Sequence, residues 1–223
     1  MTNIEESLRI VRGRMLAACQ ESGRSMGEVR LIAVTKRVDA EKVREATRRG
    51  IRDFGENYVQ EARQKVEAIG PGPTWHMIGH VQANKVKYIP RLFDYVHTVD
   101  RWELLEALDG YGKALSVLFE VNLSGEPQKH GTTKDGLRSM LDRVKTLRSV
   151  RPIGLMTVPA LEEDPEEARP AFRTLREMLH EMNKEFGLEM TELSMGMSGD
   201  FEVAIEEGAT MVRVGTALFG ERA

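Results

Sequence analysis

Short apolar runs alternate with amphipathic stretches along this chain. An N-terminal helix with one buried face is predicted by apolar residues at spacings of three and four: Ile4, Leu8, Val11, Met15 and Cys19. The run Leu31-Ile32-Ala33-Val34 is too short for a helix and predicts a buried strand. From this point the pattern predicts strands that are mostly separated by helices.

The predicted elements set the fold class. Strands are predicted at residues 31–34, 51–54, 75–78, 95–99, 114–121, 153–156, 192–193 and 210–214. Helices are predicted at residues 39–50, 57–69, 101–108, 134–147, 164–186, 201–207 and 216–219. Strands that alternate with helices pair in parallel, and eight such units predict a closed (β/α)₈ TIM barrel with the N-terminal helix packed outside it. An open doubly wound sheet is the alternative.

Composition narrows the class of protein. The chain has 223 residues, which suits a single α/β barrel domain over residues 1–223. A net charge of −3 gives no basic field, so neither nucleic acid nor a membrane surface is an expected partner. The N-terminus lacks the features of a signal peptide, and the one cysteine, Cys19, suits a reducing compartment. We therefore expect a cytoplasmic protein.

Lys36 is the first candidate for chemistry. In such barrels function lies where strands end, and the first strand ends at Val34-Thr35-Lys36. The preceding apolar residues predict partial desolvation of this amine, which would lower its pKa and favour imine formation. A solvated lysine at a strand end, with Arg37 beside it, is the plainer interpretation.

Small residues follow the last two strands. Residues 194–200 come after the seventh strand, and Gly215-Thr216 after the eighth. Loops at these positions often bind phosphate, through backbone N–H groups, hydroxyls and helix N-termini. Arg213 lies within the eighth strand, which neighbours the first in a closed barrel, so Lys36 and the two loops come together. An outward-facing Arg213 is the alternative.

The motifs together identify a family. The chain resembles the pyridoxal phosphate homeostasis proteins (YggS or PROSC), whose barrel is similar to the N-terminal domain of alanine racemase. The matching segments in order are Ala33-Val34-Thr35-Lys36, residues 54–58, 76–85, 121–122, 126–131, 154–156, 193–200 and 213–220. They run from residue 33 to residue 220, so the resemblance covers nearly the whole chain.

The resemblance implies a fold-type III barrel that binds pyridoxal 5′-phosphate (PLP). It implies that Lys36 forms a Schiff base with PLP, that Asn57 lies near the ring and that Arg213 faces the pyridine nitrogen. It also implies that the phosphate is bound by Ser198, Gly199, Gly215 and Thr216. The remaining cofactor-binding residues are wall residues: His80, Met156 and Ser194.

A metal site is not expected from the sequence. His76 and His80 are four residues apart, as metal ligands on a helix would be, but they fall on a strand that Gly79 interrupts. No third ligand follows at a sensible spacing. The basic stretch from Lys85 to Arg91 is more typical of a solvated face than of an RNA site.

Three functions fit these residues. The first is a carrier and regulator that binds PLP in intracellular PLP homeostasis without efficient turnover, with PLP-dependent apoenzymes as partners and a monomer or weak dimer as its state. The second is a PLP-dependent amino-acid racemase, and the third a Schiff-base aldolase without a cofactor. The racemase lacks support, since none of the four tyrosines matches the second base of alanine racemases. The first function is therefore expected.

Overall fold

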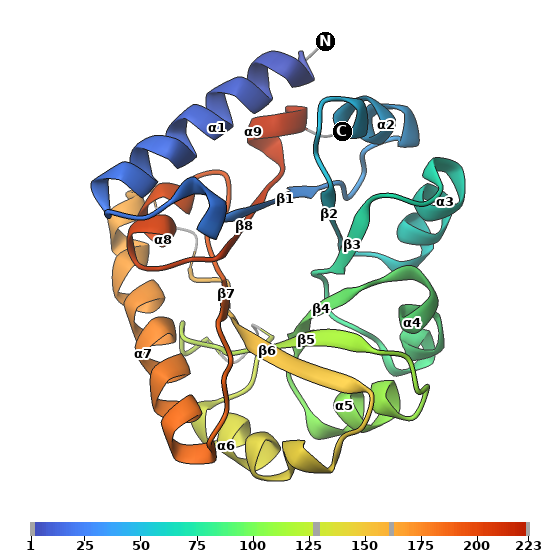
Figure 1. Cartoon of the computed structure of the whole chain (residues 1–223), viewed down its shortest axis with the longest axis vertical. Coiled ribbons are helices and arrows are strands. Elements are labelled where there is room, and N and C mark those ends of the chain that lie inside the picture. The colour runs from blue at the N-terminus through green and yellow to red at the C-terminus, as the bar shows by residue number, and fades with distance from the viewer. Residues whose placement is uncertain (1–2, 127–129, 161–162, 222–223) are drawn as a thin grey trace.

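A computed structural model gives the fold of residues 3–126, 130–160 and 163–221. Its centre is a closed barrel of parallel strands in the order β1 to β8, with β8 pairing back onto β1 (Figure 1). The strands are β1 (Arg30–Val34), β2 (Asp53–Glu56), β3 (Thr74–Met77), β4 (Tyr95–Val99), β5 (Leu115–Glu120), β6 (Val150–Met156), β7 (Glu192–Ser194) and β8 (Met211–Val214). The (β/α)₈ barrel predicted from the sequence is thus confirmed.

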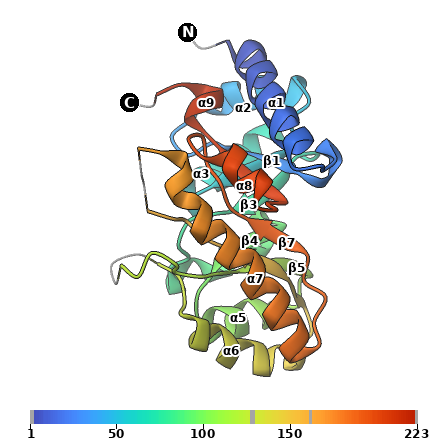
Figure 2. The same cartoon turned by 90° about the vertical axis from the view of Figure 1, so that its left-hand side faces the viewer.

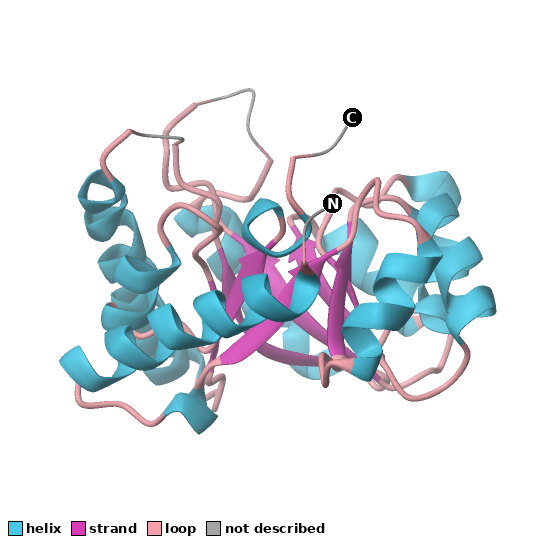
Figure 3. Cartoon of the chain, turned by 90° about the horizontal axis from the view of Figure 1, so that it is seen from above, coloured by secondary structure: helices cyan, strands magenta, loops and turns pink. Residues whose placement is uncertain are grey.

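Helices form a ring outside the strands (Figure 3). They are α1 (Ile4–Glu21), α2 (Ala40–Arg48), α3 (Val59–Ile69), α4 (Ile89–Leu92), α5 (Trp102–Asp109), α6 (Lys134–Arg143), α7 (Arg169–Phe186), α8 (Phe201–Glu206) and α9 (Thr216–Phe219). Short 3₁₀ turns are found at Met26–Glu28, Ala83–Tyr88, Val144–Thr146 and Pro165–Ala168. Helix α1 packs against α8 and α9, outside the barrel as predicted (Figure 2).

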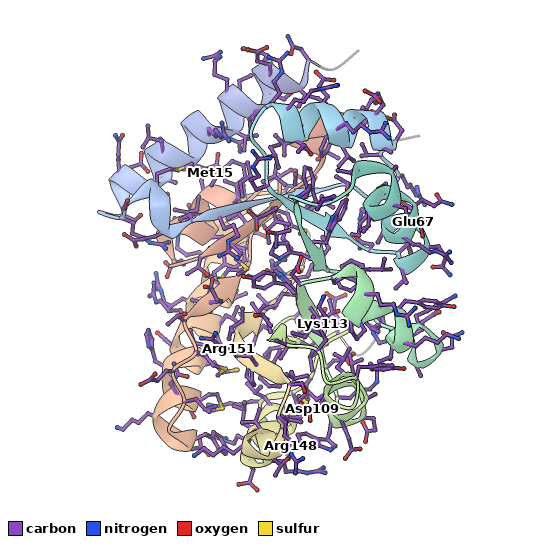
Figure 4. All side chains as sticks on the ribbon, turned by 45° about the vertical axis from the view of Figure 1, so that its right-hand side comes forward. Met15, Glu67, Asp109, Lys113, Arg148 and Arg151 are labelled. Atoms are coloured by element: carbon purple, nitrogen blue, oxygen red, sulfur yellow. The ribbon has the colours of Figure 1, made fainter. Side chains whose placement is uncertain are left out.

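The apolar core lies between the strands and this ring. The predicted face of α1 is buried, and Met15, labelled in Figure 4, has no exposed surface. On the outer side of the sheet, the rings of Phe54 and Trp75 pack with centroids 5.5 Å apart. Burial of such aromatic and aliphatic groups supplies most of the driving force for folding. Among the described residues, no helix is long and apolar enough to span a membrane.

One carboxylate ties the end of α5 to the loop that leads into β6. Asp109 ends α5, and its Oδ1 accepts hydrogen bonds from the backbone N–H groups of Arg148 (2.9 Å), Ser149 (2.6 Å) and Val150 (3.0 Å). Asp109 and Arg148 are labelled side by side in Figure 4. These bonds orient the chain as it enters β6, at the end of the barrel opposite the site described below.

The structure moves some predicted boundaries. Strand β2 begins at Asp53, two residues later than predicted, and ends on the buried Glu56. Because both of its end residues are polar, the apolar pattern did not mark its boundaries. Strand β6 begins three residues early and includes Pro152. A register shift opposite Val117 and Leu118 accommodates this residue, which has no N–H to donate. The turn Ala83–Tyr88 and the short α4 occupy a basic stretch where no helix was predicted.

Candidate functional site at the barrel mouth

Each strand brings a polar or functional residue to the same end of the barrel, which we call the mouth. Because the strands are parallel, their carboxyl ends meet there. The residues, in strand order, are Lys36, Asn57, His80, Asp100, Glu120, Thr157 with Met156, Ser194 with Ser198, and Arg213 with Gly215. The closed barrel therefore brings together residues that are up to 179 positions apart, counted from Lys36 to Gly215.

Lys36 sits in a turn that is fastened on both sides. Before it, the Thr35 hydroxyl donates to Glu56 Oε1 (2.6 Å), and the buried Lys65 ammonium donates to the Thr35 carbonyl (2.6 Å). After it, the Arg37 N–H donates to Glu61 Oε2 (2.8 Å). Arg37 has a left-handed backbone, with a φ of 56°. Such a conformation is uncommon for arginine and persists because these bonds hold it.

The side chain of Lys36 is exposed. The partial desolvation predicted from its apolar neighbours was therefore wrong. Those neighbours, Ala33 and Val34, face the interior of the structure, and the turn carries the amine beyond them into the mouth. The protein fixes the backbone on both sides of Lys36 and leaves its side chain accessible.

Ser198 joins the two small-residue loops. Its hydroxyl oxygen accepts hydrogen bonds from the N–H groups of Gly215 (3.2 Å) and Ala217 (3.4 Å), at the start of α9. With both acceptor positions used, its own proton is left to donate outward. A side chain on Gly199 would point into open space, so the adjoining backbone stays accessible. We call Ser198, Gly199, Gly215 and Thr216 the anion cradle.

Two glycines allow the loops to approach so closely. A Cβ on Gly196, whose φ is 89°, would lie 2.6 Å from the Ala204 side chain. A Cβ on Gly79 would lie 2.3 Å from the Asn57 carbonyl oxygen. Both distances are shorter than any side chain tolerates, so these positions require glycine. Gly79 thereby sets the loop after β3 directly against Asn57.

Arg213 points into the barrel interior rather than outward. It is buried, and it donates through Nη1 to Ser194 Oγ (2.6 Å) and through Nη2 to the Thr157 carbonyl (2.9 Å). The outward-facing alternative is excluded, because Thr157 follows β6 and can meet β8 only across the interior. Burial lowers the pKa of Arg213 to about 10, so the guanidinium remains charged at neutral pH.

A chain of hydrogen bonds continues from Ser194 through the barrel. Ser194 Oγ lies 2.8 Å from His97 Nδ1, and His97 Nε2 lies 2.9 Å from His76 Nδ1. His76 Nε2 lies 3.0 Å from Asp53 Oδ1, at the opposite end of the barrel. Burial lowers the pKa of both histidines, that of His97 well below its usual range. Both rings are therefore neutral at neutral pH.

This chain can run in one direction only. The Asp53 carboxylate accepts, so His76 donates from Nε2 and its Nδ1 accepts from His97 Nε2. His97 Nδ1 is then an acceptor, which makes the Ser194 hydroxyl its donor. Arg213 has no acceptor and completes the series by donating to Ser194. The interior thus fixes both histidine tautomers and the orientation of Arg213.

Five buried side-chain polar atoms have no hydrogen-bond partner among the described residues. Two are Glu56 Oε2 and Trp102 Nε1; the other three, which we consider here, follow or end β2, β3 and β5 and are Asn57 Oδ1, His80 Nδ1 and Glu120 Oε2. Burial, assisted by the nearby Asp100 and opposed by Arg213, raises the pKa of Glu120 to about 7. A buried polar atom without a partner costs free energy, so these groups mark a place for a ligand.

The structure thus gathers the residues predicted from the sequence at one end of the barrel. It also adds residues that sequence reasoning missed: Glu120, His97, Thr157 and Asp100. Glu120 carried a readable signal, since it ends an apolar strand just as Lys36 follows one. His97 lay within a predicted strand, but its partner Ser194 is 97 residues away and no spacing rule links them.

Comparisons with known proteins agree with this geometry. Residues 14–223 match the family described as alanine racemase, N-terminal domain. The pyridoxal phosphate homeostasis protein of Aquifex aeolicus is 42% identical over 225 residues, which cover 99% of each chain.

Solved structures give the same picture. PipY of Synechococcus elongatus, solved without PLP and with PLP bound, is 37% identical; the match covers 98% of this chain and 100% of PipY, with TM-scores of 0.88 and 0.87. Alanine racemase of Corynebacterium glutamicum shares the fold at 18% identity and a TM-score of 0.72, over 96% of this chain and 61% of the racemase.

Proposed function

Because this chain belongs to the pyridoxal phosphate homeostasis protein family, we propose that it binds PLP at the barrel mouth as a Schiff base on Lys36. It acts as a carrier and buffer of the cofactor in the cytoplasm. The observation that carries the proposal is the pairing of an exposed, fixed amine with a preformed anion cradle on neighbouring strands. PLP brings an aldehyde for the first and a phosphate for the second.

The residues of the mouth fit this cofactor. Ser198 has a hydroxyl proton free to donate to a phosphate oxygen, and the loop around Gly199 leaves backbone accessible. Asn57 Oδ1 is buried without a partner, as a residue beside a polar ring substituent would be. Arg213 commits two of its five N–H donors within the protein, which holds the guanidinium in place to face the ring nitrogen.

Schiff-base formation needs a nucleophilic amine and a route for water. The Lys36 amine adds to the aldehyde carbon, a C=N bond replaces the C=O bond, and one water molecule leaves. Because Lys36 is exposed in the unliganded protein, this water has an open path. Lys65 is the wrong lysine for this step, since its ammonium is buried between Glu56 and the Thr35 carbonyl.

A carrier is favoured over a racemase by what surrounds the amine. A racemase needs a second base on the other face of its substrate. Tyr95 begins β4 at the end opposite the mouth, and Tyr88 and Tyr111 line a separate pocket with Lys113. Tyr58, after β2, is exposed and forms no side-chain cap on α3.

The binding proposal is tested on the purified chain. Titration with PLP should give a visible absorbance band at one cofactor per chain, and borohydride should convert it into a stable adduct. Peptide mapping should place the adduct on Lys36. An adduct on another lysine, or a colourless protein that still cleaves a sugar phosphate, would overturn the proposal in favour of another lysine or of the aldolase.

The carrier role needs a separate test. The PLP-loaded protein is incubated with single enantiomers of many amino acids in deuterium oxide, and chirality and α-deuterium exchange are followed. We expect turnover far below the ~10 s⁻¹ typical of enzymes. Turnover near that value would show an enzyme, and a Tyr58→Phe variant would then show whether Tyr58 is the second base. Transfer of PLP to a PLP-dependent apoenzyme tests the carrier role directly.

A further inference from the structure

Three side chains converge on the rim of the mouth across from the anion cradle. His80 follows β3, Asp100 follows β4, and His130 precedes α6 in the connection from β5. Each offers one ligand atom, and these three atoms all lie within 4.8 Å of one another. The rings of His80 and His130 stack with centroids 4.1 Å apart. None of the three has a part in the Schiff base or the phosphate contacts proposed above.

We propose that His80, Asp100 and His130 form a binding site for a divalent transition-metal ion of the Zn²⁺ class. Two imidazole nitrogens and one carboxylate oxygen are the ligand types that Zn²⁺ takes, and three protein ligands leave a fourth position open to solvent or a small ligand. This site was not expected from the spacing of the histidines along the chain. His76, the apparent partner of His80, is bonded inside the barrel, and the missing ligands come from two other loops.

The distances suit such an ion. His80 Nδ1 and Asp100 Oδ2 lie 3.4 Å apart. Ligand atoms in a tetrahedral zinc site lie about 3.4 Å apart, the spacing that bonds of about 2.1 Å produce. Only His130 has to move inward, and its side chain is exposed and so able to rotate off the His80 ring. Two of the three ligand atoms therefore already have the spacing of a bound state.

Arg101 holds the Asp100 carboxylate in an orientation that suits a metal ligand. Asp100 Oδ1 accepts from Arg101 Nη1 (2.6 Å), and Arg101 Nη2 donates to the Val81 carbonyl (2.7 Å). Arg101 thus occupies one oxygen of Asp100 and turns the other toward His80, as the outer partners of metal ligands do. His80 Nδ1 is buried and has no hydrogen-bond partner among the described residues, and in the tautomer protonated at Nε2 its lone pair is available to a cation.

The charges around His80 limit how tightly a cation is held. The groups that face His80 are Asp100, His130 and Arg101, with Glu120 near Asp100 on the next strand. Arg101 reduces the negative charge of this set, so we expect a micromolar rather than a tighter site.

The experiment uses the full chain without a polyhistidine tag, stripped of metal and of PLP. Zn²⁺ is titrated in competition with a chromophoric chelator, and Co²⁺ is added separately to record its visible spectrum. We expect one Zn²⁺ per chain with a dissociation constant of about 1 µM, and the intense Co²⁺ bands of a four-coordinate site. Cys19, the one thiol, is buried in α1 and does not compete.

Variants assign the ligands. His130→Gln and Asp100→Asn should each weaken Zn²⁺ binding about 100-fold. His180→Gln, which changes an exposed histidine on α7, should leave it unchanged. Both the wild type and His130→Gln should show a cooperative melting transition, which establishes that each is folded. Zn²⁺ should raise the melting temperature of the wild type but not that of His130→Gln.

The proposal fails if the wild type does not bind Zn²⁺ in this range, or if His180→Gln weakens binding as much as His130→Gln does. Lys36→Ala should still bind Zn²⁺ fully. The metal site and the PLP site can therefore be confirmed or refuted independently.

Discussion

The two halves of the mouth differ in how far the protein satisfies its own polar groups. On the β7–β8 side, Ser198 already bonds two backbone N–H groups, and Arg213 and Ser194 are hydrogen-bonded to each other. On the β2–β5 side, Asn57, His80 and Glu120 each keep a buried atom without a partner. The first half is preorganised, so binding of the proposed phosphate would need little rearrangement; the second half leaves polar atoms that a ligand would satisfy.

The largest effect is expected from Lys36→Ala. The visible band and the borohydride-stable adduct should disappear, because the neighbouring Lys65 is buried and held by Glu56 and the Thr35 carbonyl. Noncovalent PLP binding should persist through the anion cradle. Lys42→Ala, an exposed change on α2, is the matched control and should behave as the wild type. A full-stoichiometry adduct on the Lys36→Ala protein would place the Schiff base elsewhere.

Ser194→Ala should cost the cofactor-free protein about 3 kcal/mol in free energy of unfolding. It removes the acceptor of Arg213 and the donor to His97, and each buried group left unsatisfied costs about 1–3 kcal/mol. Urea denaturation measures the loss. Ser139→Ala, an exposed serine on α6, should change stability by less than about 0.5 kcal/mol. Equal small losses in both variants would mean that the interior chain contributes nothing to stability.

Glu120→Gln should stabilise the protein, but only above acidic pH. Burial raises the pKa of Glu120 from 4.5 to about 7, so the folded state binds more protons than the unfolded state in that range. Wild-type stability therefore falls as pH rises through this window, by up to about 3 kcal/mol. The variant should match the wild type near pH 4 and exceed it at pH 8, measured by denaturation at each pH. A constant difference at all pH values would contradict this assignment.

The smallest effect is expected from Ser198→Ala, on the preorganised side. PLP binding should weaken about tenfold, near 1.5 kcal/mol, since one charge-assisted donor is lost while backbone donors of the cradle remain. Pyridoxal, which lacks the phosphate, should lose little affinity and serves as the internal control. A Thr216→Val variant should show the same selectivity. Equal losses for both ligands would place these residues away from the phosphate.

The same contrast explains what sequence could predict. Strand and helix order followed from periodicity, and the cradle from small residues in two consecutive loops, because these signals are local. The hydrogen bonds from Arg213 to Ser194 and from Ser194 to His97 depend on which residues face each other across a closed barrel. The exposure of Lys36 likewise depends on the turn held by Lys65 and Glu61, which no run of neighbouring residues encodes.

The one-way hydrogen-bond chain inside the barrel constrains how this sequence can diverge. Replacement of His97, for example, leaves an acceptor on His76 and a donor on Ser194 without partners at the same time. Neighbours in such a network are coupled by about 0.5–3 kcal/mol, so their substitutions are strongly epistatic. Accepted changes along the chain should therefore arrive in compensating pairs. A designer who wants an apolar barrel interior has to replace His76, His97, Ser194 and Arg213 together.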